Sequence, residues 1–343
     1  MSMQLHKQAA KAISSSNEIK QKSIIIKRTR PVPTVVFQSY WKFAAERQNI
    51  FFKRINNTLG PWTDDPILRT YKFTNAYRAS DRVSQFLLHD VIYGGSQEPK
   101  DLFFRTMLFK LFNKIETWEM LTREVGNITW DQYSFKKFNS PLTKAIDSGV
   151  TIYSSAYIMP SGSSSFGSSR KHENHLHLIE LMMRDRLYEQ LQLANSMEAA
   201  YRLILQYPTI GSFLAYQYLI DLNYSNLTNF DEMEFVVPGP GARDGIAKCF
   251  LDQGGYSESD IIRMMAEIQD EQFEKHGVVF KDLFGRKLQL IDCQNLFCEI
   301  DKYARVAHPD ISGLSGRTRI KQSHRPRYKP IQYMFPPKWN LEL

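Results

Sequence analysis

Three acidic residues stand close together in the segment FDEMEF, at Asp231, Glu232 and Glu234. A carboxylate held beside a sugar ring can stabilise positive charge that develops on the sugar, and it can orient a water molecule as the nucleophile. The sequence does not tell which of the three side chains points inward. We therefore treat all three as candidate catalytic residues, with a solvated acidic loop as the alternative.

These acids must be positioned by the elements before them, where the segment YPTIGSFLAYQ covers residues 207–217. Its Pro and Gly predict a tight turn between two helices, the second of which begins at Ser212. The free backbone N–H groups at the start of that helix favour a phosphate, and Gly211 lets the phosphate come close. We expect Thr209, Gly211 and Ser212 to bind a phosphate backbone, with an ordinary corner between helices as the alternative.

A second glycine-rich turn, PGPGARDG, covers residues 238–245. Gly239 and Gly241 permit close backbone approach to a phosphate, and Arg243 and Lys248 add positive charge. The turn lacks the lysine and serine of an ATP-binding loop, so we expect it to contact DNA rather than a nucleotide. A plain turn is the alternative interpretation.

The net charge of +8 is concentrated at the two ends of the chain. Residues 1–30 hold seven Lys or Arg and one Glu, and residues 311–343 hold the same numbers. This distribution favours a polyanion as the binding partner of the two ends. Two alternatives would show the same pattern: tails that only keep the protein in solution, and a tail that packs its aromatic residues on the body. The basic residues that we assign to DNA binding in the C-terminal tail are Arg317, Arg319, Arg325 and Arg327.

The rest of the chain predicts helices, with apolar residues at helical spacing, for example Trp41, Ala44, Gln48, Phe51 and Ile55. Helix starts are expected after Asp65, Ser80, Ser196 and either Ser257 or Ser259, and one helix is expected to continue to Gly277. Strand signals are limited to SIIIK and EFVV. We predict an all-α fold in two lobes with a cleft. The expected division is a basic segment 1–36, a helical domain 37–310 with a mobile Gly/Ser loop at 160–169, and a basic tail 311–343.

Several classes of protein are disfavoured by the composition. No apolar stretch has the length of a membrane span and no signal peptide is evident, so we expect a cytoplasmic protein without a membrane partner. Cys249, Cys293 and Cys298 have no metal-site spacing, and HENHLH lacks a zinc-protease pattern. We expect no metal, no nucleotide and no other cofactor, apart from a monovalent cation that the hairpin could bind.

The hairpin and the acid that follows it resemble the helix-hairpin-helix DNA glycosylase superfamily. Members carry Leu-Pro-Gly-x-Gly and a catalytic Asp about twenty residues after the second glycine, and here Asp231 follows Gly211 by that spacing. Tyr207 replaces the leucine and Thr209 the first glycine. Phe213 stands in place of the Schiff-base lysine of bifunctional members, which implies an enzyme without lyase activity.

Longer stretches resemble, more specifically, the helical domain of 5-hydroxymethyluracil DNA kinases and of the alpha-glutamyl/putrescinyl thymine pyrophosphorylase family. They are YWKFAAERQNIFFKR, PWTDDPILRTYKFTNAYRASDRVSQFL, IGSFLAYQYLIDLNYS, VVPGPGARDGI and LIDCQNLFCEIDKYAR. The resemblance implies that Asn75, Tyr77, Arg78 and Arg82 fill the gap that a flipped base leaves in DNA. It covers phage enzymes that build hypermodified thymines and bacterial antiphage glycosylases.

Our leading hypothesis is a monofunctional DNA glycosylase of antiphage defence. It would flip out and excise a hypermodified or glucosylated hydroxymethyl pyrimidine from phage DNA, with Asp231 as the essential carboxylate. A transferase that attaches an amino acid or amine to phosphorylated 5-hydroxymethyluracil in DNA is the first alternative, with Arg243 and Lys248 on the leaving phosphate. A non-catalytic DNA-binding module is the second.

Overall fold

The computed structural model describes residues 28–56, 59–326, 328 and 332–341, and these residues fold mainly into helices. The strands among them form a single two-stranded sheet, in which β1 (Val32–Pro33) pairs antiparallel with β2 (Phe250–Asp252). The expected all-α class is therefore confirmed. The strand expected at SIIIK lies outside the described residues, as does Arg327.

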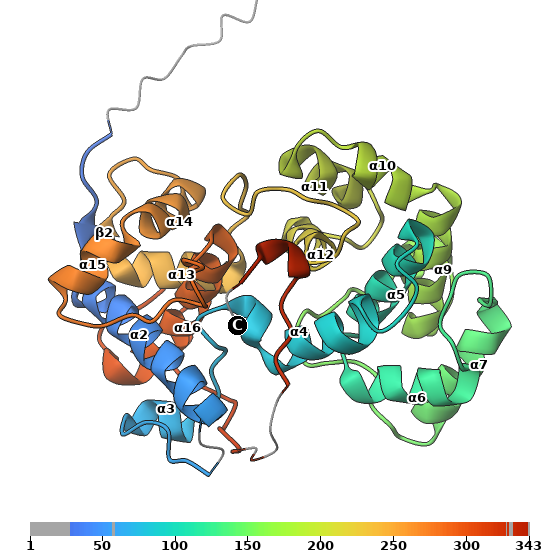
Figure 1. Cartoon of the computed structure of the whole chain (residues 1–343), viewed down its shortest axis with the longest axis horizontal. Coiled ribbons are helices and arrows are strands. Elements are labelled where there is room, and N and C mark those ends of the chain that lie inside the picture. Colours follow the sequence, from blue (N-terminus) through green and yellow to red (C-terminus); the bar gives the residue numbers. More distant parts are fainter. Residues whose placement is uncertain (1–27, 57–58, 327, 329–331, 342–343) are drawn as a thin grey trace, which may run out of the picture.

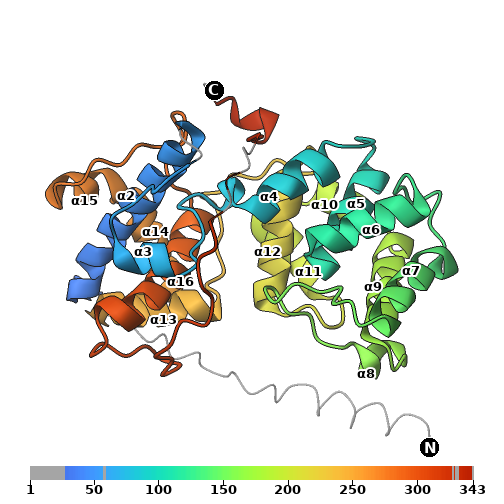
Figure 2. The same cartoon turned by 90° about the horizontal axis from the view of Figure 1, so that it is seen from below.

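The helices form two lobes that stand side by side in both views (Figures 1 and 2). Within the described residues, the chain passes from the first lobe to the second between η1 and α4 and returns between α12 and α13. The first lobe contains α2 (Val35–Asn56), α3 (Pro66–Thr70), η1 (Arg78–Ser80), α13 (Pro240–Cys249), α14 (Glu258–Glu267), α15 (Gln269–Lys275) and α16 (Leu290–Ala307). The second lobe contains α4 (Arg82–Phe86), η2 (Leu87–Ile92), α5 (Pro99–Phe112), α6 (Ile115–Val125), α7 (Phe135–Asp147), α8 (Ser163–Phe166), α9 (Lys171–Arg184), α10 (Leu187–Leu193), α11 (Met197–Leu205) and α12 (Ser212–Asn223).

Helices α13 and α16 make the closest packing in the first lobe. At Gly245 the backbones approach so closely that an added Cβ would lie 2.0 Å from the carbonyl oxygen of Phe297. Helix α2 covers this pair with the predicted stripe, since Trp41, Ala44 and Phe51 are buried. At the end of the stripe Ile55 is 40% exposed. The apolar periodicity therefore identifies the inward face of α2 but extends about one turn too far.

In the second lobe, α5 is buried from Asp101 to Phe112 and forms the centre around which α9, α10 and α12 pack. The Gly/Ser segment lies at the edge of this lobe and includes α8. Asn174 fixes its two ends, because its side chain donates to the carbonyl oxygens of Ser161 and Ser168 and accepts from the Ser168 N–H. That the segment is mobile stays a prediction.

The helix caps follow the sequence closely. Asp65 accepts from the N–H groups of Ile67 and Leu68 with Pro66 in the first turn, and Ser196 accepts from the Ala199 N–H. Ser257 is the residue that starts α14. The expectation at Ser80 was wrong, because Ser80 ends η1 and donates to the Tyr77 carbonyl, while Asp81 stands at the start of α4.

Two expected elements are absent in the form predicted. The helix expected to continue to Gly277 is divided at Ile268 into α14 and α15. At the break the buried Gln269 side chain donates to the carbonyl oxygens of Ala266 and Leu288 and accepts from the Leu288 N–H. EFVV is not a strand. Its backbone carbonyls and that of Met233 instead accept from the side chains of Arg263, Ser259 and Tyr216.

The cap at Ser257 gives a prediction for stability. Its hydroxyl accepts from the Asp260 N–H at 3.1 Å, and the Asp260 carboxylate accepts from the Ser257 N–H at 3.1 Å. Ser257→Ala is expected to lower the free energy of unfolding by about 1 kcal/mol, because it leaves helix N–H groups without a partner. Urea unfolding measures the loss, and Ser257→Asn should retain most of the stability because asparagine also caps.

None of the helices within the described ranges has the combined length and apolar character needed to cross a membrane.

Candidate functional site

The predicted hairpin is formed by α11 and α12, with the turn at residues 206–211 between them. Thr209 takes the left-handed backbone conformation, with φ of 69°, and its hydroxyl is buried without a hydrogen-bond partner in the described part of the chain. Gly211 precedes α12 and no side chain caps the helix. A Cβ at Gly211 would meet no atom within 4 Å, so packing does not explain this glycine.

The three candidate acids lie in different environments. Asp231 is exposed, and its carboxylate accepts from the Met233 N–H, which stabilises the local turn. Glu234 is also exposed and accepts from the Met197 N–H at the start of α11. Only Glu232 is buried, at 6% exposure. The inward-pointing acid of the segment is therefore Glu232, one residue after the position that the spacing selected.

Glu232 lies at the junction of the lobes, in contact with the C-terminal segment 332–341. Its Oε1 accepts from the Arg286 guanidinium at 2.9 Å and from the Trp339 indole N–H at 3.0 Å. The Arg286 guanidinium also stacks over the Trp339 ring, 3.9 Å from its centroid. Burial raises the pKa of Glu232, and the opposite charges of Arg286 and Lys338 act against that rise. We call these four residues the Glu232 cluster.

Lys338 is the second cation of the cluster. Its ammonium donates to the backbone carbonyls of Ser225 at 3.1 Å and Thr228 at 2.7 Å. Burial lowers the pKa of Lys338 to about 8, although Glu232 acts in the opposite direction. Figures 1 and 2 both show the turn η3 (Pro337–Trp339) between the two lobes.

A buried ion network, here the Asp221 triad, lies next to this cluster and joins the lobes. Arg78 forms two hydrogen bonds with Asp221, at 2.6 and 2.9 Å, and the Lys110 ammonium lies 3.0 Å from the same carboxylate. All three side chains are at most 3% exposed. Burial alone would raise the pKa of Asp221, but the two cations outweigh it and hold the pKa below its ordinary value. Tyr224 connects the two sites, since its ring contacts Trp339 and its hydroxyl accepts from Arg78.

Asp292, at the start of α16, is the buried acid beneath η1. It accepts from the N–H groups of Arg78 at 2.8 Å and Gln289 at 3.0 Å. Burial raises its pKa to about 7, with Glu232 adding to the rise and Arg286 and the two N–H donors opposing it. Asp292 and Gln289 form a capping box at the start of α16.

The raised pKa of Asp292 predicts a pH dependence of stability. The folded protein holds this proton more tightly than the unfolded chain does. The contribution of Asp292 to the free energy of unfolding is therefore fully present below pH 3.8 and is lost as the pH rises to about 7. Within that window the free energy of unfolding is expected to fall by about 1.4 kcal/mol per pH unit because of this group. Urea unfolding at several pH values should show a shallower slope for Asp292→Asn, and an equal slope in both proteins would contradict the assignment.

The other residues assigned to DNA binding divide into buried and exposed sets. Tyr77 and Arg78 are buried, and Lys248 is buried in an ion pair with Asp301 at 2.8 Å, so these side chains are held inside the fold. Asn75 bonds to Arg47 and to the Ser80 carbonyl. The exposed residues are Ser212, Arg82, Arg243, Arg317, Arg319 and Arg325.

The two glycine turns come together through Phe213. A Cβ at Gly239, which precedes α13, would lie 2.7 Å from the Phe213 ring, and that ring stacks on Tyr157 with centroids 5.8 Å apart. Gly241 packs in the same way against Cys298. The residue facing Phe213 across the two turns is thus Gly239.

Three important residues were missed from the sequence: Asp221, Lys110 and Arg286. Asp221 and Lys110 could have been found, because each is a charged residue within an apolar helix, where a paired buried charge is the usual explanation. Trp339 belongs to the aromatic tail, whose packing on the body was an alternative interpretation, and Arg286 lies in a segment without a recognisable motif. Their proximity to Glu232 is visible only in three dimensions.

The histidines of HENHLH have structural contacts. His172 bonds to Thr143, and His175 bonds to the Tyr153 hydroxyl and to the Pro160 carbonyl. His177 stacks on Phe135 and pairs with Glu180. These contacts hold the Gly/Ser segment and α7 against α9.

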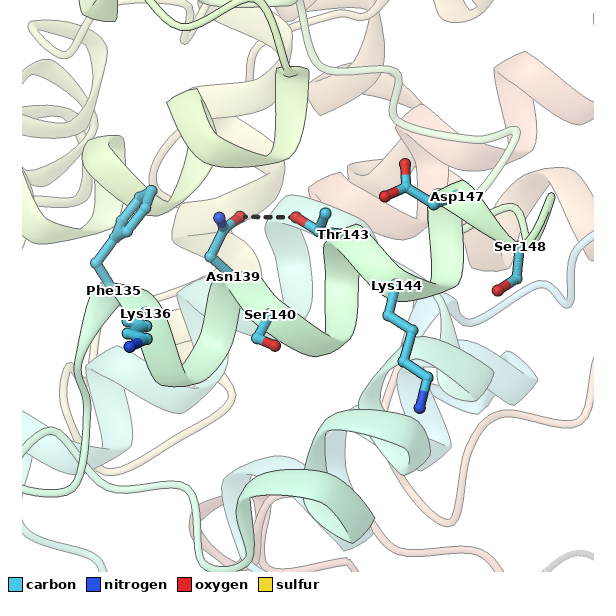
Figure 3. A pocket seen from close by; sticks show the side chains of 8 residues that line it. All are labelled: Phe135, Lys136, Asn139, Ser140, Thr143, Lys144, Asp147 and Ser148. Atoms are coloured by element: carbon cyan, nitrogen blue, oxygen red, sulfur yellow. Dashed lines mark hydrogen bonds between the residues drawn. The ribbon is translucent and has the colours of Figure 1, made fainter.

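One hollow on the described surface is an open depression of about 550 Å³ along α7. Figure 3 shows its lining side chains on one helix, with Asn139 bonded to Thr143 and with Lys136 and Lys144 directed away from that bond. It lies at the outer end of the second lobe, far from the junction in Figures 1 and 2. A hollow formed by one exposed helix lacks the converging polar groups of a reaction site, so we place the site at the junction.

Comparison with curated proteins identifies a relative that bears on the chemistry. The chain is 28% identical over 302 residues to the 5-hmdU DNA kinase of Bacillus phage SP10, which covers 82% of this chain. The chain spans only 47% of the length of that relative. No solved structure matches the chain significantly. The relative is named as a kinase, which is a transferase, so our hypothesis of a base-excising glycosylase was wrong.

The family comparison covers most of the fold. The profile of the 5-hmdU DNA kinase helical domain matches residues 34–313, which include the hairpin, the Asp221 triad, Glu232 and Arg286. The broader resemblance to the helix-hairpin-helix DNA glycosylase superfamily is not supported by a match. The chain therefore belongs to the family of the 5-hmdU DNA kinase helical domain.

Proposed function

We propose that this chain binds DNA that contains 5-hydroxymethyluracil and acts in group transfer at the 5-hydroxymethyl group of that base. The observation that carries the proposal is the family match over residues 34–313, together with the name of the phage relative. The transferase alternative of the sequence analysis agrees with both. Because the chain spans about half of the relative, its own share of the reaction is part of the proposal.

The charge distribution supports DNA as the partner. Arg82, Arg243, Arg317, Arg319 and Arg325 are exposed, and exposed arginines bind phosphates in a salt-dependent manner. The hairpin adds the uncapped start of α12 beside Gly211, where packing leaves space for a close ligand. In contrast, the pairing of Lys248 with Asp301 leaves Arg243 as the accessible cation for a phosphate at the second glycine turn.

The donor of the transferred group follows from the reaction class. A kinase takes its phosphoryl group from a nucleoside triphosphate, so the relative gives no support to our expectation that no nucleotide takes part. Phosphoryl transfer would add phosphate to the hydroxymethyl oxygen. Displacement by an amine would instead break the carbon–oxygen bond of a phosphorylated hydroxymethyl group and release phosphate.

Two incubations test the proposal. In the first, the protein receives DNA containing 5-hydroxymethyluracil and a radiolabelled nucleoside triphosphate. In the second, it receives DNA with the phosphorylated base and a mixture of amino acids and polyamines. The digested nucleosides are analysed by mass spectrometry, with thymine DNA as the control. Phosphate on the nucleoside, or amine in place of phosphate, supports group transfer and identifies its type. Unchanged nucleosides in both incubations, or abasic sites, contradict group transfer by this chain alone.

A further inference from the structure

The C-terminal segment 332–341 is fixed to the lobe junction by polar contacts. The Met334 N–H donates to the Gln85 side chain at 2.8 Å, and that side chain donates back to the Met334 carbonyl at 3.0 Å. Trp339 donates to Glu232, and Lys338 donates to the carbonyl oxygens of Ser225 and Thr228. Side-chain hydrogen bonds of this kind can be exchanged for water or for a ligand at a modest cost.

The place that Trp339 occupies has the features of a base-binding site. The Arg286 guanidinium lies over one face of the indole, and Phe335 stacks near it with centroids 6.2 Å apart and planes at 19°. The ring of Tyr224 meets the indole edge-on at 5.6 Å. The carboxylate of Glu232 accepts from the ring N–H. Stacking of aromatic and guanidinium groups on a ring, combined with a hydrogen bond to the ring edge, is how enzymes hold a base outside the helix.

One polar group in this site lacks a partner. The Nε of Arg286 is buried and makes no hydrogen bond within the described residues, although the same guanidinium donates to Glu232 through another nitrogen. A buried donor without an acceptor costs free energy, so it needs an explanation. An indole offers one N–H and no acceptor. It therefore satisfies Glu232 and leaves the Arg286 Nε unsatisfied.

A uracil-type ring would satisfy Glu232 as the indole does, because its N3–H can donate to the carboxylate. The Arg286 guanidinium would lie over the face of that ring, as it lies over the indole. Neutral cytosine has an acceptor at N3, so it would face the acceptor oxygens of Glu232 without a proton between them. The Glu232 carboxylate thus selects for rings that carry an N–H at this position.

We propose that the Trp339 site is a binding site for a uracil-type base of DNA and that Trp339 occupies it as an internal substitute until the base displaces it. The identification of the base as 5-hydroxymethyluracil rests on the proposed function. The preference for an N–H over a ring acceptor does not, because it follows from the Glu232 carboxylate alone.

The test is a binding measurement that needs no turnover. Single-stranded oligonucleotides with one central 5-hydroxymethyluracil, thymine, cytosine or abasic analogue are titrated by fluorescence anisotropy. Trp339→Ala is expected to bind the two uracil-type oligonucleotides on the order of tenfold more tightly than the unaltered protein, because the site no longer has to be vacated. Affinity for the abasic oligonucleotide should not change.

Two further variants keep the inference falsifiable. Gln85→Ala loosens the segment at Met334 without changing the site, and it should give the same gain in smaller degree. Trp339→Ala combined with Glu232→Gln should lose the preference for uracil-type bases over cytosine. Circular dichroism confirms that each variant is folded. Equal or weaker binding by folded Trp339→Ala and Gln85→Ala, or an unchanged preference in the double variant, would overturn the inference and make Trp339 a structural contact.

The two proposals can fail separately. If the variants show the expected base preference but the nucleosides stay unchanged in both incubations, the base site stands and catalysis by this chain fails. If the nucleosides are modified at the same rate with Trp339→Ala and with the unaltered protein, and no base preference is found, the group transfer stands and the base site is wrong.

Discussion

Asp221→Ala is expected to lower the free energy of unfolding by about 3–5 kcal/mol, because it leaves two buried cations without a counter-charge. Arg78 donates two hydrogen bonds to this carboxylate, Lys110 lies 3.0 Å from it, and the three side chains are at most 3% exposed. Urea unfolding followed by circular dichroism measures the loss. Since the triad joins α5 and α12 to η1, the loss should affect both lobes.

Two matched variants separate the charge from the packing. Glu198→Ala breaks the Arg202–Glu198 pair on α11, which is at least half exposed, and should cost about 0.5 kcal/mol or less. A triple replacement of Arg78, Lys110 and Asp221 by Met, Met and Leu removes every charge of the triad while keeping similar volume, and it should recover most of the stability. If Asp221→Ala costs less than about 1 kcal/mol, the network does not join the lobes energetically.

Much of the helical fold could be predicted because its signals are local. The cap at Ser196 and the Asp65–Pro66 pair depend on hydrogen bonds within three residues, so the sequence contains all the information that they need. The break at Ile268 depends instead on Gln269, whose amide bonds to Leu288 across the lobe. A tertiary contact of this kind leaves no local pattern, and the helix was therefore predicted as continuous.

The same distinction explains why the site was found only approximately. The hairpin and the acidic segment could be identified, but the spacing selected Asp231, which is exposed, and burial selects its neighbour Glu232. What places Glu232 inward is its contact with Arg286 and Trp339, which lie 54 and 107 residues further along the chain. Residue type and spacing predict that an acid is present, whereas its direction depends on segments distant in sequence.

The comparison with relatives corrected the reaction because the fold alone does not determine it. The excision hypothesis depended on Asp231 as a carboxylate held beside the sugar. In the structure Asp231 is exposed and accepts from the Met233 N–H, and the buried acid Glu232 is paired with Arg286. A paired carboxylate next to a stacked ring is suited to holding a base, which agrees with a family named for a base-modifying kinase.

Gly245→Ala is expected to destabilise the protein by about 3 kcal/mol, because the added methyl group would lie 2.0 Å from the Phe297 carbonyl oxygen. That atom belongs to the backbone of α16 and cannot rotate away, so α13 and α16 must separate. The separation would also move Asp292 and Gln294, which α16 presents to the lobe junction. In an unobstructed helix the same change would add up to about 1 kcal/mol of stability, so the clash has to exceed that gain.

Gly241→Ala is the matched control, since it lies in the same helix and also faces α16. Its Cβ would lie 3.1 Å from the Cys298 sulfur, which is a side-chain atom that can shift, so the expected loss is below about 1 kcal/mol. Thermal unfolding and urea unfolding of both variants measure the difference. Similar losses for the two substitutions would mean that α13 and α16 can move apart, and the junction between the lobes would then depend less on this helix pair than the geometry indicates.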